Sequence, residues 1–462
     1  MMTFLATAEE TSNQQTCVII GASHAGVTCA FELRKQGFAG RILLVDGGKH
    51  LPYHRPPLSK AYLSVPVGEP PAKLKPEAAY TKANIELLLG VNATYISTDK
   101  QMVYVKSISA PFEQRKLVFT HLVLATGATP IIPPVDGLNG CFEKARENTQ
   151  NNVLVMRNAD NAMALKALVN NPNKPIADFH AVVIGAGYIG LEAASSLRKA
   201  GAQVTVIERE SRPLARVASE EVSQFVETLH RHQGVNVMCN EAVVSVAPSA
   251  SQVTPKKEVT AQYDVVCNSG KRLLVDCILI GAGVCINTEL AASANLQIEK
   301  RAIRVDGRMQ TSNDIIWAIG DCTVFPHPEY GNDTHIESVQ NALEQAKIAA
   351  KNVTLSTNQD TKCRTEIAPS AYCAIPWFWS DQFDIKLQIA GLMQSADTRI
   401  LRIDSEHARS IWHFKGDTLC CVEAINSPKA YVLGSKWIAA HAVIDPQKLI
   451  DPSIDLTTLN SD

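Results

Sequence analysis

The sequence lacks an excess of charge of either sign, since 44 lysine and arginine residues face 46 aspartate and glutamate residues. That balance excludes a protein that binds nucleic acid over its whole surface. The sequence also lacks an uncharged apolar run of roughly 18 to 20 residues, which a membrane-spanning helix needs. The first residues have neither a basic start nor a long apolar stretch. We therefore expect a frayed tail, no signal peptide and a cytoplasmic protein.

The sequence has no C-x-x-C motif, although it contains 12 cysteines. The cysteines are scattered, and most stand in apolar strand-like runs, such as Cys17 in "TCVII" and Cys277 in "VDCILI". This distribution favours buried free thiols in a reducing compartment over disulfides. No metal site is predicted.

One phrase is present twice in the chain. "VIIGASHAG" (Val18 to Gly26) returns as "VVIGAGYIG" (Val182 to Gly190), and "LRKQG" after the first copy returns as "LRKAG" after the second. A chain of 462 residues is too long for one ordinary core, so two or three domains are expected. The repeat suggests that two of them have the same local architecture.

The first copy predicts a strand, a glycine-rich turn, a helix and a second strand. "QTCVIIG" is a buried strand that stops at Gly21, a helix runs from Ala25 to Gln36, and "RILLVD" is a strand ending on Asp46. The first glycine makes the turn, the second position lets backbone approach a pyrophosphate, and the third lets helix pack on strand. Ser23 replaces the middle glycine, and its hydroxyl either bonds a phosphate or crowds it.

The second copy has all three glycines, at Gly185, Gly187 and Gly190, and its second strand ends on Glu208. One such motif alone is weak, because small residues often pack helices on sheets. Two copies in strand–turn–helix–strand context, each ending in an acid, predict two dinucleotide sites. Glu208 would repel a 2′-phosphate and so favours NADH over NADPH, although the adjacent Arg209 weakens that preference. Two carriers that exchange electrons are usually a flavin and a nicotinamide.

Three further segments read as strands followed by glycine turns. They are "HLVLATGATP" (His121 to Pro130), "LLVDCILIGAG" (Leu273 to Gly283) and "DIIWAIGDC" (Asp314 to Cys322). Asp321 either bonds a ribityl hydroxyl or water near the phosphates, or caps the helix predicted in "THIESVQNALEQAKIAAKNV", or does both.

These motifs together resemble a known family. The double fingerprint with "ATG", "GYIGLE" and "IWAIGDC" resembles the two-dinucleotide flavoprotein reductases related to glutathione reductase. "YHRPPLSKAYL" (Tyr53 to Leu63), "PWFWSDQFDIKLQIAGL" (Pro376 to Leu392) and "IESVQNALEQA" narrow the resemblance to ferredoxin reductases of oxygenase systems, the putidaredoxin reductase family. The similarity extends over nearly the whole chain from about residue 16.

The resemblance implies an α/β fold with two Rossmann-like domains and a C-terminal α+β domain. The FAD domain would comprise residues 15–130 and 280–365, the inserted NAD domain 131–279, and the C-terminal interface domain 366–462. Within these ranges, "VASEEVSQFVETLHRHQG" predicts an amphipathic helix. "TRILRI", "SIWHF" and "TLCCVEAI" predict an antiparallel sheet, followed by a helix in "PKAYVLGSKWIAAHAVI".

The resemblance also implies site residues. For FAD these are Gly21, Ser23, Ala25, Gly26, Asp46, Lys60, Ala93, Thr126, Gly127, Asp321 and Val339. For NAD they are Gly185, Gly187, Tyr188, Ile189, Gly190, Glu208 and Gly283. Catalytic roles fall to Lys60 near the flavin N5, to its partner Glu192, and to Trp379 near the isoalloxazine, where the partner protein would dock. Taken alone, Lys60 could also be an ordinary lysine on a helix surface. Trp379 could also be a core residue that packs between domains.

Relatives that reduce disulfides carry a cysteine pair beside the flavin, and this sequence has none there. The implied function is therefore an NADH-dependent reductase that passes electrons through FAD to a small iron–sulfur ferredoxin of the two-iron type. That ferredoxin would feed a haem monooxygenase or a Rieske dioxygenase. The alternatives are a rubredoxin reductase or NADH oxidase on the same fold, and a flavoprotein like apoptosis-inducing factor with an interaction role. The oligomeric state is left open between monomer and weak dimer.

Four positions depart from the family pattern on the flavin side. Gly47 stands where an acid is usual, Thr129 and Ile131 where an arginine commonly follows "ATG", and His335 where relatives often have arginine. FAD affinity is the property these changes affect. Two-iron ferredoxins of this class are usually acidic, so a local basic rim is expected. Lys347 and Lys351, four residues apart on a predicted helix, are the candidates, with an ordinary solvated face as the alternative.

Overall fold

The computed structural model describes residues 15–110, 112–147, 152–249, 262–357, 371–394 and 396–459, so the expected N-terminal tail lies outside the described part. These residues form two compact units. The first unit contains the residues up to Tyr53, Lys73–Gly127 and Ile286–Ala374. The second contains His54–Ala72, Ala128–Cys285 and the chain from Ile375 onward. Each unit holds one copy of the repeated phrase.

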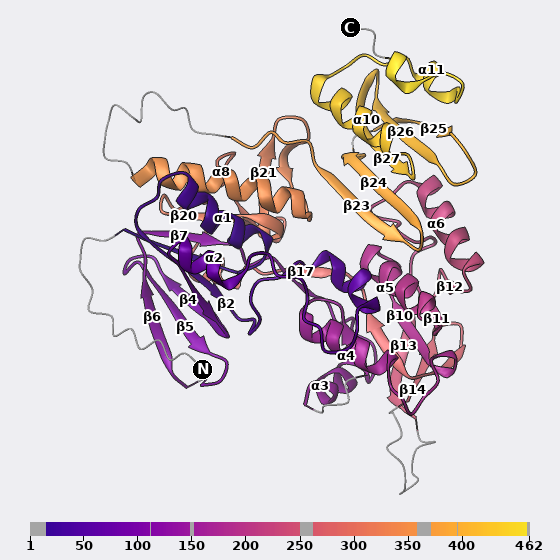
Figure 1. The fold of residues 1–462 in the computed structure, drawn as a ribbon, viewed down its shortest axis with the longest axis horizontal. Coiled ribbons are helices and arrows are strands. Elements are labelled where there is room, and N and C mark those ends of the chain that lie inside the picture. Colours follow the sequence, from indigo (N-terminus) through magenta and orange to yellow (C-terminus); the bar gives the residue numbers. More distant parts are fainter. Residues whose placement is uncertain are drawn as a thin grey trace, which may run out of the picture. The chain divides into compact units, whose positions relative to one another are not determined.

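The first unit is built on a parallel sheet of five strands (Figure 1). Their order is β20 (Ile316–Ala318), β7 (His121–Leu124), β1 (Thr16–Ile20), β2 (Arg41–Asp46) and β3 (Ile85–Leu89). Cys17, Val18 and Ile19 of β1 are fully buried. A strand buried on both faces needs a continuous apolar run, which is the pattern "TCVII" has.

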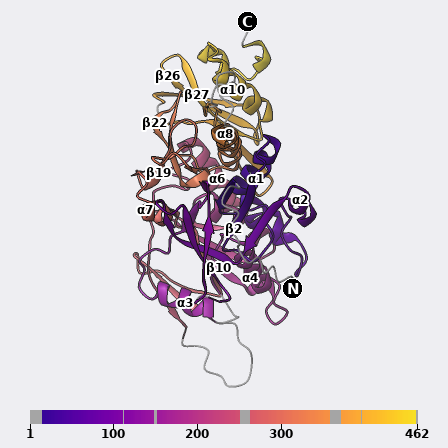
Figure 2. The same ribbon diagram turned by 90° about the vertical axis from the view of Figure 1, so that its left-hand side faces the viewer.

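Helices α1 (His24–Lys35) and α8 (Val339–Thr357) lie side by side in the first unit, as Figures 1 and 2 show. The unit also contains α2 (Glu77–Lys82), α7 (Glu289–Ser293) and the 3₁₀ helix η5 (Gly320–Cys322). A second sheet is formed by β4 (Val91–Ser97), β5 (Met102–Ser107) and β6 (Gln114–Val118). A third comprises β18 (Ile298–Glu299), β19 (Ala302–Arg304), β21 (Thr323–His327) and β22 (Gly331–Thr334).

The second unit repeats the parallel sheet. Its strand order is β12 (Asn236–Met238), β11 (Gln203–Ile207), β10 (His180–Ile184), β16 (Cys277–Ile280) and β9 (Val153–Val155). Strands β10 and β11 flank the glycine turn as β1 and β2 do in the first unit. The connection from α1 to β2 is two residues longer than that from α5 (Tyr188–Lys199) to β11. With this difference allowed for, Asp46 and Glu208 occupy equivalent places in the two copies.

The remaining elements around this sheet are short. The helices are η1 (Pro56–Ser59), η2 (Ala61–Ser64), α3 (Leu138–Glu147), α4 (Ala159–Val169), η3 (Ile176–Asp178) and α6 (Glu220–His232). Strands β13 (Val243–Pro248), β14 (Tyr263–Cys267) and β15 (Arg272–Val275) form an antiparallel sheet, and β8 (Ala128–Pro130) pairs with β17 (Val284–Ile286). The amphipathic helix predicted over residues 217–234 is α6.

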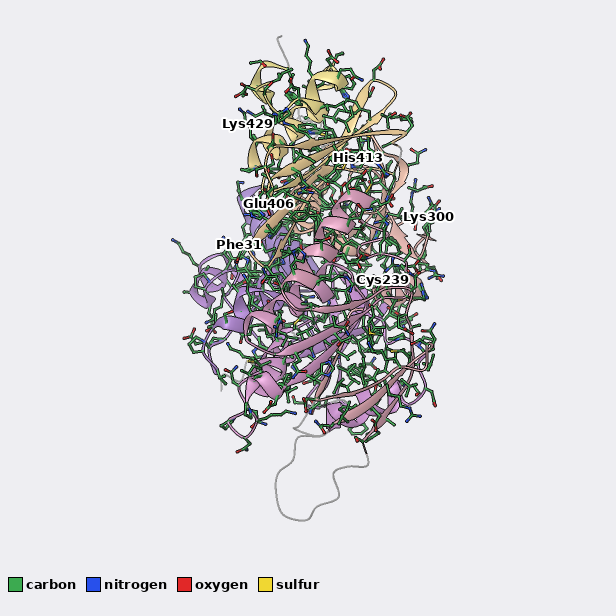
Figure 3. The ribbon with its side chains drawn as sticks, turned by 90° about the vertical axis from the view of Figure 1, so that its right-hand side faces the viewer. Phe31, Cys239, Lys300, Glu406, His413 and Lys429 are labelled. Carbon is green, nitrogen blue, oxygen red and sulfur yellow. The ribbon has the colours of Figure 1, made fainter. Side chains whose placement is uncertain are left out.

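The second unit also contains an antiparallel sheet near the C-terminus. Its order is β23 (Trp377–Gln382), β24 (Ile385–Gly391), β27 (Thr418–Ile425), β26 (Arg409–Lys415) and β25 (Thr398–Ile403). Helices α10 (Pro428–Ala440), α11 (Pro446–Ile450) and η6 (Leu456–Thr458) follow or flank it. The three predicted strands and the helix are confirmed, but α10 ends early because His441 is left-handed, with φ 50°. His413 of β26, labelled in Figure 3, bonds the buried Glu423 at 2.9 Å.

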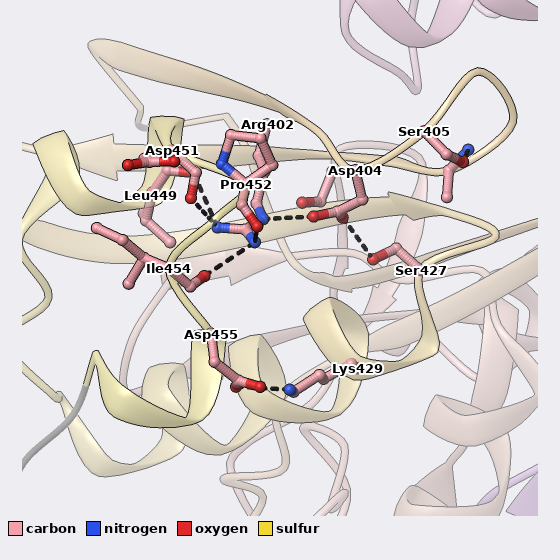
Figure 4. Close-up of polar contacts among 12 residues, drawn as sticks. Arg402, Asp404, Ser405, Ser427, Lys429, Leu449, Asp451, Pro452, Ile454 and Asp455 are labelled. Atoms are coloured by element: carbon pink, nitrogen blue, oxygen red, sulfur yellow. Dashed lines mark hydrogen bonds and ion pairs between the residues drawn. The ribbon is translucent and has the colours of Figure 1, made fainter.

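A buried arginine ties the last described residues to this sheet (Figure 4). Arg402 of β25 is 3% exposed and donates to the Asp404 carboxylate at 2.6 Å. Its guanidinium also donates to the carbonyl oxygens of Leu449, Asp451, Pro452 and Ile454. Five N–H donors in a planar fork allow one arginine to bond this many acceptors.

Two sequence predictions about local structure are wrong. The strand expected over Leu273 to Gly283 is broken at Asp276 into β15 and β16, because the buried Asp276 carboxylate accepts the backbone N–H of His180 and the side chain of Gln262. The N-cap position of α8 belongs to Ser338 and not to Asp321, which lies in η5 before a β-hairpin. The hydroxyl of Ser338 accepts the N–H of Asn341 at 3.1 Å and caps α8.

The cysteines in the described ranges form no disulfide, and this includes the half-buried Cys239 labelled in Figure 3. The prediction of free thiols is confirmed for these residues. Among the helices that the structure describes, none is both long and apolar enough to cross a membrane.

Candidate functional site: two nucleotide cradles and a buried lysine–glutamate pair

The glycines of the first copy fill places that no side chain could occupy. Gly21 has φ +108°, and a Cβ added to it would lie 2.2 Å from the carbonyl oxygen of Ala125. A Cβ on Gly26 would lie 1.8 Å from the carbonyl oxygen of Gly21. The turn and the close approach of helix to strand therefore both require glycine, as the sequence predicts.

The second copy has the same constraints and one difference. A Cβ on Gly185 would lie 2.4 Å from the carbonyl oxygen of Gly281, and one on Gly190 would lie 2.3 Å from that of Gly185. A Cβ on the middle glycine, Gly187, would meet nothing within 4 Å. Glycine at that position is not needed for internal packing, so the open space fits the approach of a pyrophosphate. In the first copy Ser23 takes this place.

The two helices that follow the glycine turns begin without a side-chain cap. Neither Ser23 before α1 nor Gly187 before α5 bonds the first turn with its side chain. By contrast, Asn158 caps α4 and Ser219 caps α6. An uncapped N-terminus leaves a positive dipole end available to phosphate, so α1 and α5 fit the dinucleotide role and α4 and α6 do not.

The acids at the ends of the second strands have matching hydrogen bonds. Asp46 accepts the backbone N–H of Ala22 at 2.7 Å, and Glu208 accepts that of Ala186 at 2.7 Å. The second oxygen of each acid accepts a following N–H, from Gly48 at 2.6 Å and from Glu210 at 2.9 Å. Each carboxylate is thus fixed beside its glycine turn, where an adenosine ribose is bound in this kind of unit.

The other predicted FAD residues lie in the first unit, except Lys60. Ala93 is on β4, Val339 begins α8, and Gly127 has φ 62° at the turn after β7. Thr126 and Asn287 exchange hydrogen bonds of 2.8 Å, which fix that turn.

Sequence reasoning missed Asn287, and it also missed Gln345. The buried Gln345 side chain accepts the N–H of Gly320 at 2.6 Å and so holds the turn that carries Asp321. The only signal for Gln345 in the sequence was its position in "IESVQNALEQA", a stretch quoted for the family resemblance.

Departures from the family pattern have local explanations at two positions. A Cβ on Gly47 would lie 2.2 Å from the side-chain oxygen of Asn92, so Asn92 occupies the space beside the missing acid. His335 bonds the carbonyl oxygen of Thr323 at 2.9 Å and the carboxylate of Glu337 at 3.1 Å. Since both partners only accept, both ring nitrogens donate in the charged imidazolium.

Electrostatics at His335 favour that charged form. Burial alone would lower its pKa. The hydrogen bonds to Glu337 and Thr323, with the charges of Glu337 and Asp321, outweigh burial and raise the pKa above its usual value. The raised pKa favours a cation at the position where the family resemblance leads us to expect arginine in relatives.

Lys60 and Glu192, predicted as partners, are brought together in the second unit. The Nζ of Lys60, between η1 and η2, lies 3.3 Å from Glu192 on α5 and 3.0 Å from Asp381 on β23. It also lies 5.4 Å from the ring centroid of the half-buried Trp379. The cation is therefore held by two carboxylates and an aromatic face.

Glu192 is buried, with 5% of its surface exposed. Desolvation raises its pKa, and Lys60 and the hydroxyls of Ser380 and Ser59 oppose that rise. Ser59 donates to one carboxylate oxygen at 2.7 Å and Ser380 to the other at 2.6 Å. Sequence reasoning missed both serines and Asp381, although they stand in the quoted stretches "PPLSK" and "WFWSDQ".

The remaining predicted NAD residues lie on α5 and after β16. The ring of Tyr188 is 4.4 Å from that of Phe378, and Ile189 is 47% exposed. Gly283 has φ +101°, a conformation that favours glycine. Both glycine cradles thus fit a dinucleotide, and the two cysteines of the first copy, Cys17 on β1 and Cys29 on α1, are buried and form no disulfide.

Lys347 and Lys351 both lie on α8, as predicted. Lys347 is exposed and pairs with Glu344 at 2.7 Å, so its charge is partly neutralised. Exposed pairs of this kind contribute little to stability, and the lysine can exchange partners readily.

Comparison with known proteins gives the same assignment. Residues 15–346 match the model of the pyridine nucleotide-disulphide oxidoreductases, and residues 377–460 match a reductase C-terminal domain. The chain is 36% identical over 440 residues to putidaredoxin reductase CamA of Pseudomonas putida, covering 95% of each. It is 34% identical over 441 residues to rhodocoxin reductase of Rhodococcus erythropolis, covering 95% of this chain and 93% of the relative.

Among solved structures, the covalent putidaredoxin reductase–putidaredoxin complex superposes with a TM-score of 0.83 at 35% identity, covering 97% of this chain and 98% of that one. The duplicated glycine cradles and these similarities together show that the chain belongs to the pyridine nucleotide-disulphide oxidoreductase family, in its ferredoxin reductase branch.

Proposed function

We propose that this chain is an NADH-dependent, FAD-containing reductase that delivers electrons to a small iron–sulfur ferredoxin, which in turn serves an oxygenase. The terminal oxygenase would be a haem monooxygenase or a Rieske dioxygenase. The named relatives are reductases of putidaredoxin and rhodocoxin. The free thiols of the described residues agree with a reducing compartment, and we place the protein in the cytoplasm.

The observation that carries this proposal is the pair of equivalent cradles. Each unit has a parallel sheet, a glycine turn that excludes side chains, an uncapped helix and an acid bonded to the turn. One chain so built holds two dinucleotides at once. FAD, when bound, supplies a centre that accepts a hydride from NADH and releases electrons singly.

The protein's own groups position and stabilise these cofactors. The N-termini of α1 and α5 bind the pyrophosphates, and Asp46 and Glu208 bind the adenosine riboses. Asp321 and the backbone at Val339 bind the flavin's ribityl and pyrimidine ends. Lys60 provides a fixed cation that stabilises negative charge on the flavin, and Glu192 and Asp381 hold that cation in place. Trp379, whose ring lies against the Lys60 ammonium, would contact the bound flavin and the partner protein.

The test begins with cofactor content. The purified protein should be yellow, and acid precipitation should release one FAD per chain into the supernatant. Colour that remains in the pellet would contradict non-covalent binding.

The second step compares electron acceptors under NADH. Ferricyanide, oxygen, a rubredoxin, and cytochrome c with and without an added two-iron ferredoxin are offered in parallel. Ferredoxin-dependent reduction of cytochrome c should greatly exceed oxygen consumption. A preference for rubredoxin, or a rate with oxygen equal to that with ferredoxin, would replace the proposal with a rubredoxin reductase or an NADH oxidase.

A further inference from the structure

Three consecutive polar residues, Ser380, Asp381 and Gln382, stand at the end of β23. Side chains alternate between the faces of a strand, so Ser380 and Gln382 share one face. Both are fully buried, whereas Asp381 is partly exposed. Because β23 is an edge strand of its sheet, Lys60 reaches Asp381 and Glu192 at the same time.

The buried face of β23 joins a chain of hydrogen bonds that ends on Glu192. His230 of α6 contacts Gln382 at 2.9 Å, Gln382 contacts Ser380 at 2.9 Å, and Ser380 contacts Glu192 at 2.6 Å. His230, Gln382 and Ser380 are each 0% exposed. The chain of hydrogen bonds therefore runs through the interior of the unit.

The direction of each bond follows from the chemistry of the groups. An ionised carboxylate only accepts, so the single hydroxyl proton of Ser380 must go to Glu192. The Ser380 oxygen then accepts from the Gln382 amide nitrogen, which turns the amide oxygen toward His230. His230 must therefore carry its proton on Nε2. All three donors point toward the carboxylate, and aligned bonds of this kind strengthen one another.

His230 suits the far end of such a chain. Burial lowers its pKa to about 4, against the opposing effect of its bond to Gln382, so the ring is neutral at ordinary pH. Its other nitrogen, Nδ1, has no hydrogen-bond partner within the part of the chain that the structure describes. A neutral imidazole donating from Nε2 fixes the orientation of the Gln382 amide without placing a second charge near Lys60.

The ionisable groups around Glu192 are few. Lys60 faces it directly, and Tyr188 approaches it from its own helix, α5. Asp381 acts on it through Lys60, and His230 acts through the chain. Burial is the largest effect on Glu192 and raises its pKa, and two hydroxyl donors and one cation limit that rise.

We propose that Ser380 and Gln382 are positioning residues, which together with Ser59 and His230 keep Glu192 ionised and thereby hold the Lys60 ammonium at a fixed place. Only the target of the Lys60 charge, the flavin, rests on the proposed function. The hydrogen-bond chain itself is a property of this unit of the fold.

The experiment titrates Glu192 in the FAD-loaded protein by infrared difference spectroscopy, which detects the carbonyl band of a protonated carboxylic acid. The band is assigned with Glu192→Gln, in which it should be absent. Ser380→Ala removes a hydrogen bond to a charged group, which is worth roughly tenfold or more, so the midpoint should rise by about one pH unit. Ser59→Ala should raise the Glu192 midpoint by a similar amount. Gln382→Met should raise it less, because the Ser380 hydroxyl can still donate to Glu192.

The matched control is Ser410→Ala. Ser410 is also 0% exposed, lies on β26 of the same sheet and accepts only from the indole of Trp412 in the described structure. The Glu192 midpoint in Ser410→Ala should equal that in the wild type. An unchanged midpoint in Ser380→Ala, or an equal rise in Ser410→Ala, would overturn the proposal.

A second readout separates positioning from general loosening. In NADH-to-ferricyanide turnover, the pH profile of kcat should shift with the infrared midpoint, while the KM for NADH stays within about twofold. Ser380→Thr, which keeps the hydroxyl, should restore both. Failure to reduce any ferredoxin would refute the proposed function and leave the infrared result unaffected, so the two failures are distinguishable.

Discussion

Glu208 accepts the backbone N–H of Ala186 at 2.7 Å, the same distance at which Asp46 accepts that of Ala22. The carboxylate is therefore already fixed beside the glycine turn. Fixing it in advance lowers the ordering cost of binding a ribose diol and keeps negative charge where a 2′-phosphate would arrive.

Replacing Glu208 with alanine should raise the KM for NADH by about ten- to hundredfold, since a charged hydrogen bond is lost. The KM for NADPH should rise less, so the preference of the enzyme for NADH over NADPH should become smaller. Steady-state kinetics with ferricyanide as acceptor measure both. Glu210→Ala is the control, because that side chain pairs only with the exposed Arg209 among its described partners and should change neither constant. Equal use of NADPH and NADH by the wild type would contradict the assignment.

The pH dependence of the unfolding free energy should reveal the titration of the His335 imidazole. Its folded pKa is raised, so the stabilisation is fully present below the unfolded value of about 6.5 and is lost as pH rises through the folded value. Because the group is partly exposed, the loss should be about 1 kcal/mol. The Tm of the FAD-loaded protein should therefore fall by a few degrees as the pH rises above about 6.5, relative to a variant whose residue 335 cannot titrate.

That variant is His335→Arg, which keeps the cation at every pH and restores the residue common in relatives. It should remove the drop and release FAD more slowly at alkaline pH, as fluorescence of free FAD reports. His335→Gln should lose the stabilisation at all pH values. If Tm depends on pH in the same way in the wild type and in His335→Arg, the charge on the imidazole does not contribute to stability.

The repeated strand–turn–helix–strand units could be predicted from sequence because their constraints are local. Gly21 and Gly185 adopt positive φ beside a neighbouring carbonyl, and only glycine permits that. Fully buried strands such as β1 leave apolar runs that are visible directly. The pairing of Lys60 with Glu192 came from the family resemblance, and the structure brings the two side chains within 3.3 Å.

The supporting residues could not be predicted because nothing local marks them. The bond from Ser59 to Glu192 spans 133 residues and that from Ser380 to Glu192 spans 188. Asp276 breaks a strand by bonding side chains and backbone distant in sequence, which an apolar pattern does not reveal. The roles of the cofactor-binding residues and the division into three domains at residues 130, 280 and 366 stay predictions.

Loss of Arg402 should release the C-terminal segment from its sheet. Removing one partner of a buried ionic network costs about 3 to 5 kcal/mol, and four carbonyl oxygens would also lose their donor. Arg402→Met should speed hydrogen exchange and proteolytic cleavage within residues 446–459. Arg399→Met, on the same strand, removes the ion pairs of an exposed arginine with the exposed Glu220 and the half-buried Glu221, and should change the unfolding free energy by less than about 1 kcal/mol. Equal protection in both variants would contradict the role of Arg402.

Reversing Lys347 and Lys351 to glutamate should slow electron transfer to an acidic ferredoxin. Complementary charge acts mainly on the encounter rate, and salt screens it over a Debye length of about 8 Å at physiological ionic strength. The second-order rate with ferredoxin should therefore fall roughly tenfold at low salt and converge on the wild type at high salt. Ferricyanide needs no docking surface, so its reduction should not change. Glu344→Gln tests the pairing seen in the structure, because freeing Lys347 should speed the ferredoxin reaction slightly. Equal losses with both acceptors in the double variant would mean that α8 supports the flavin site and not the partner.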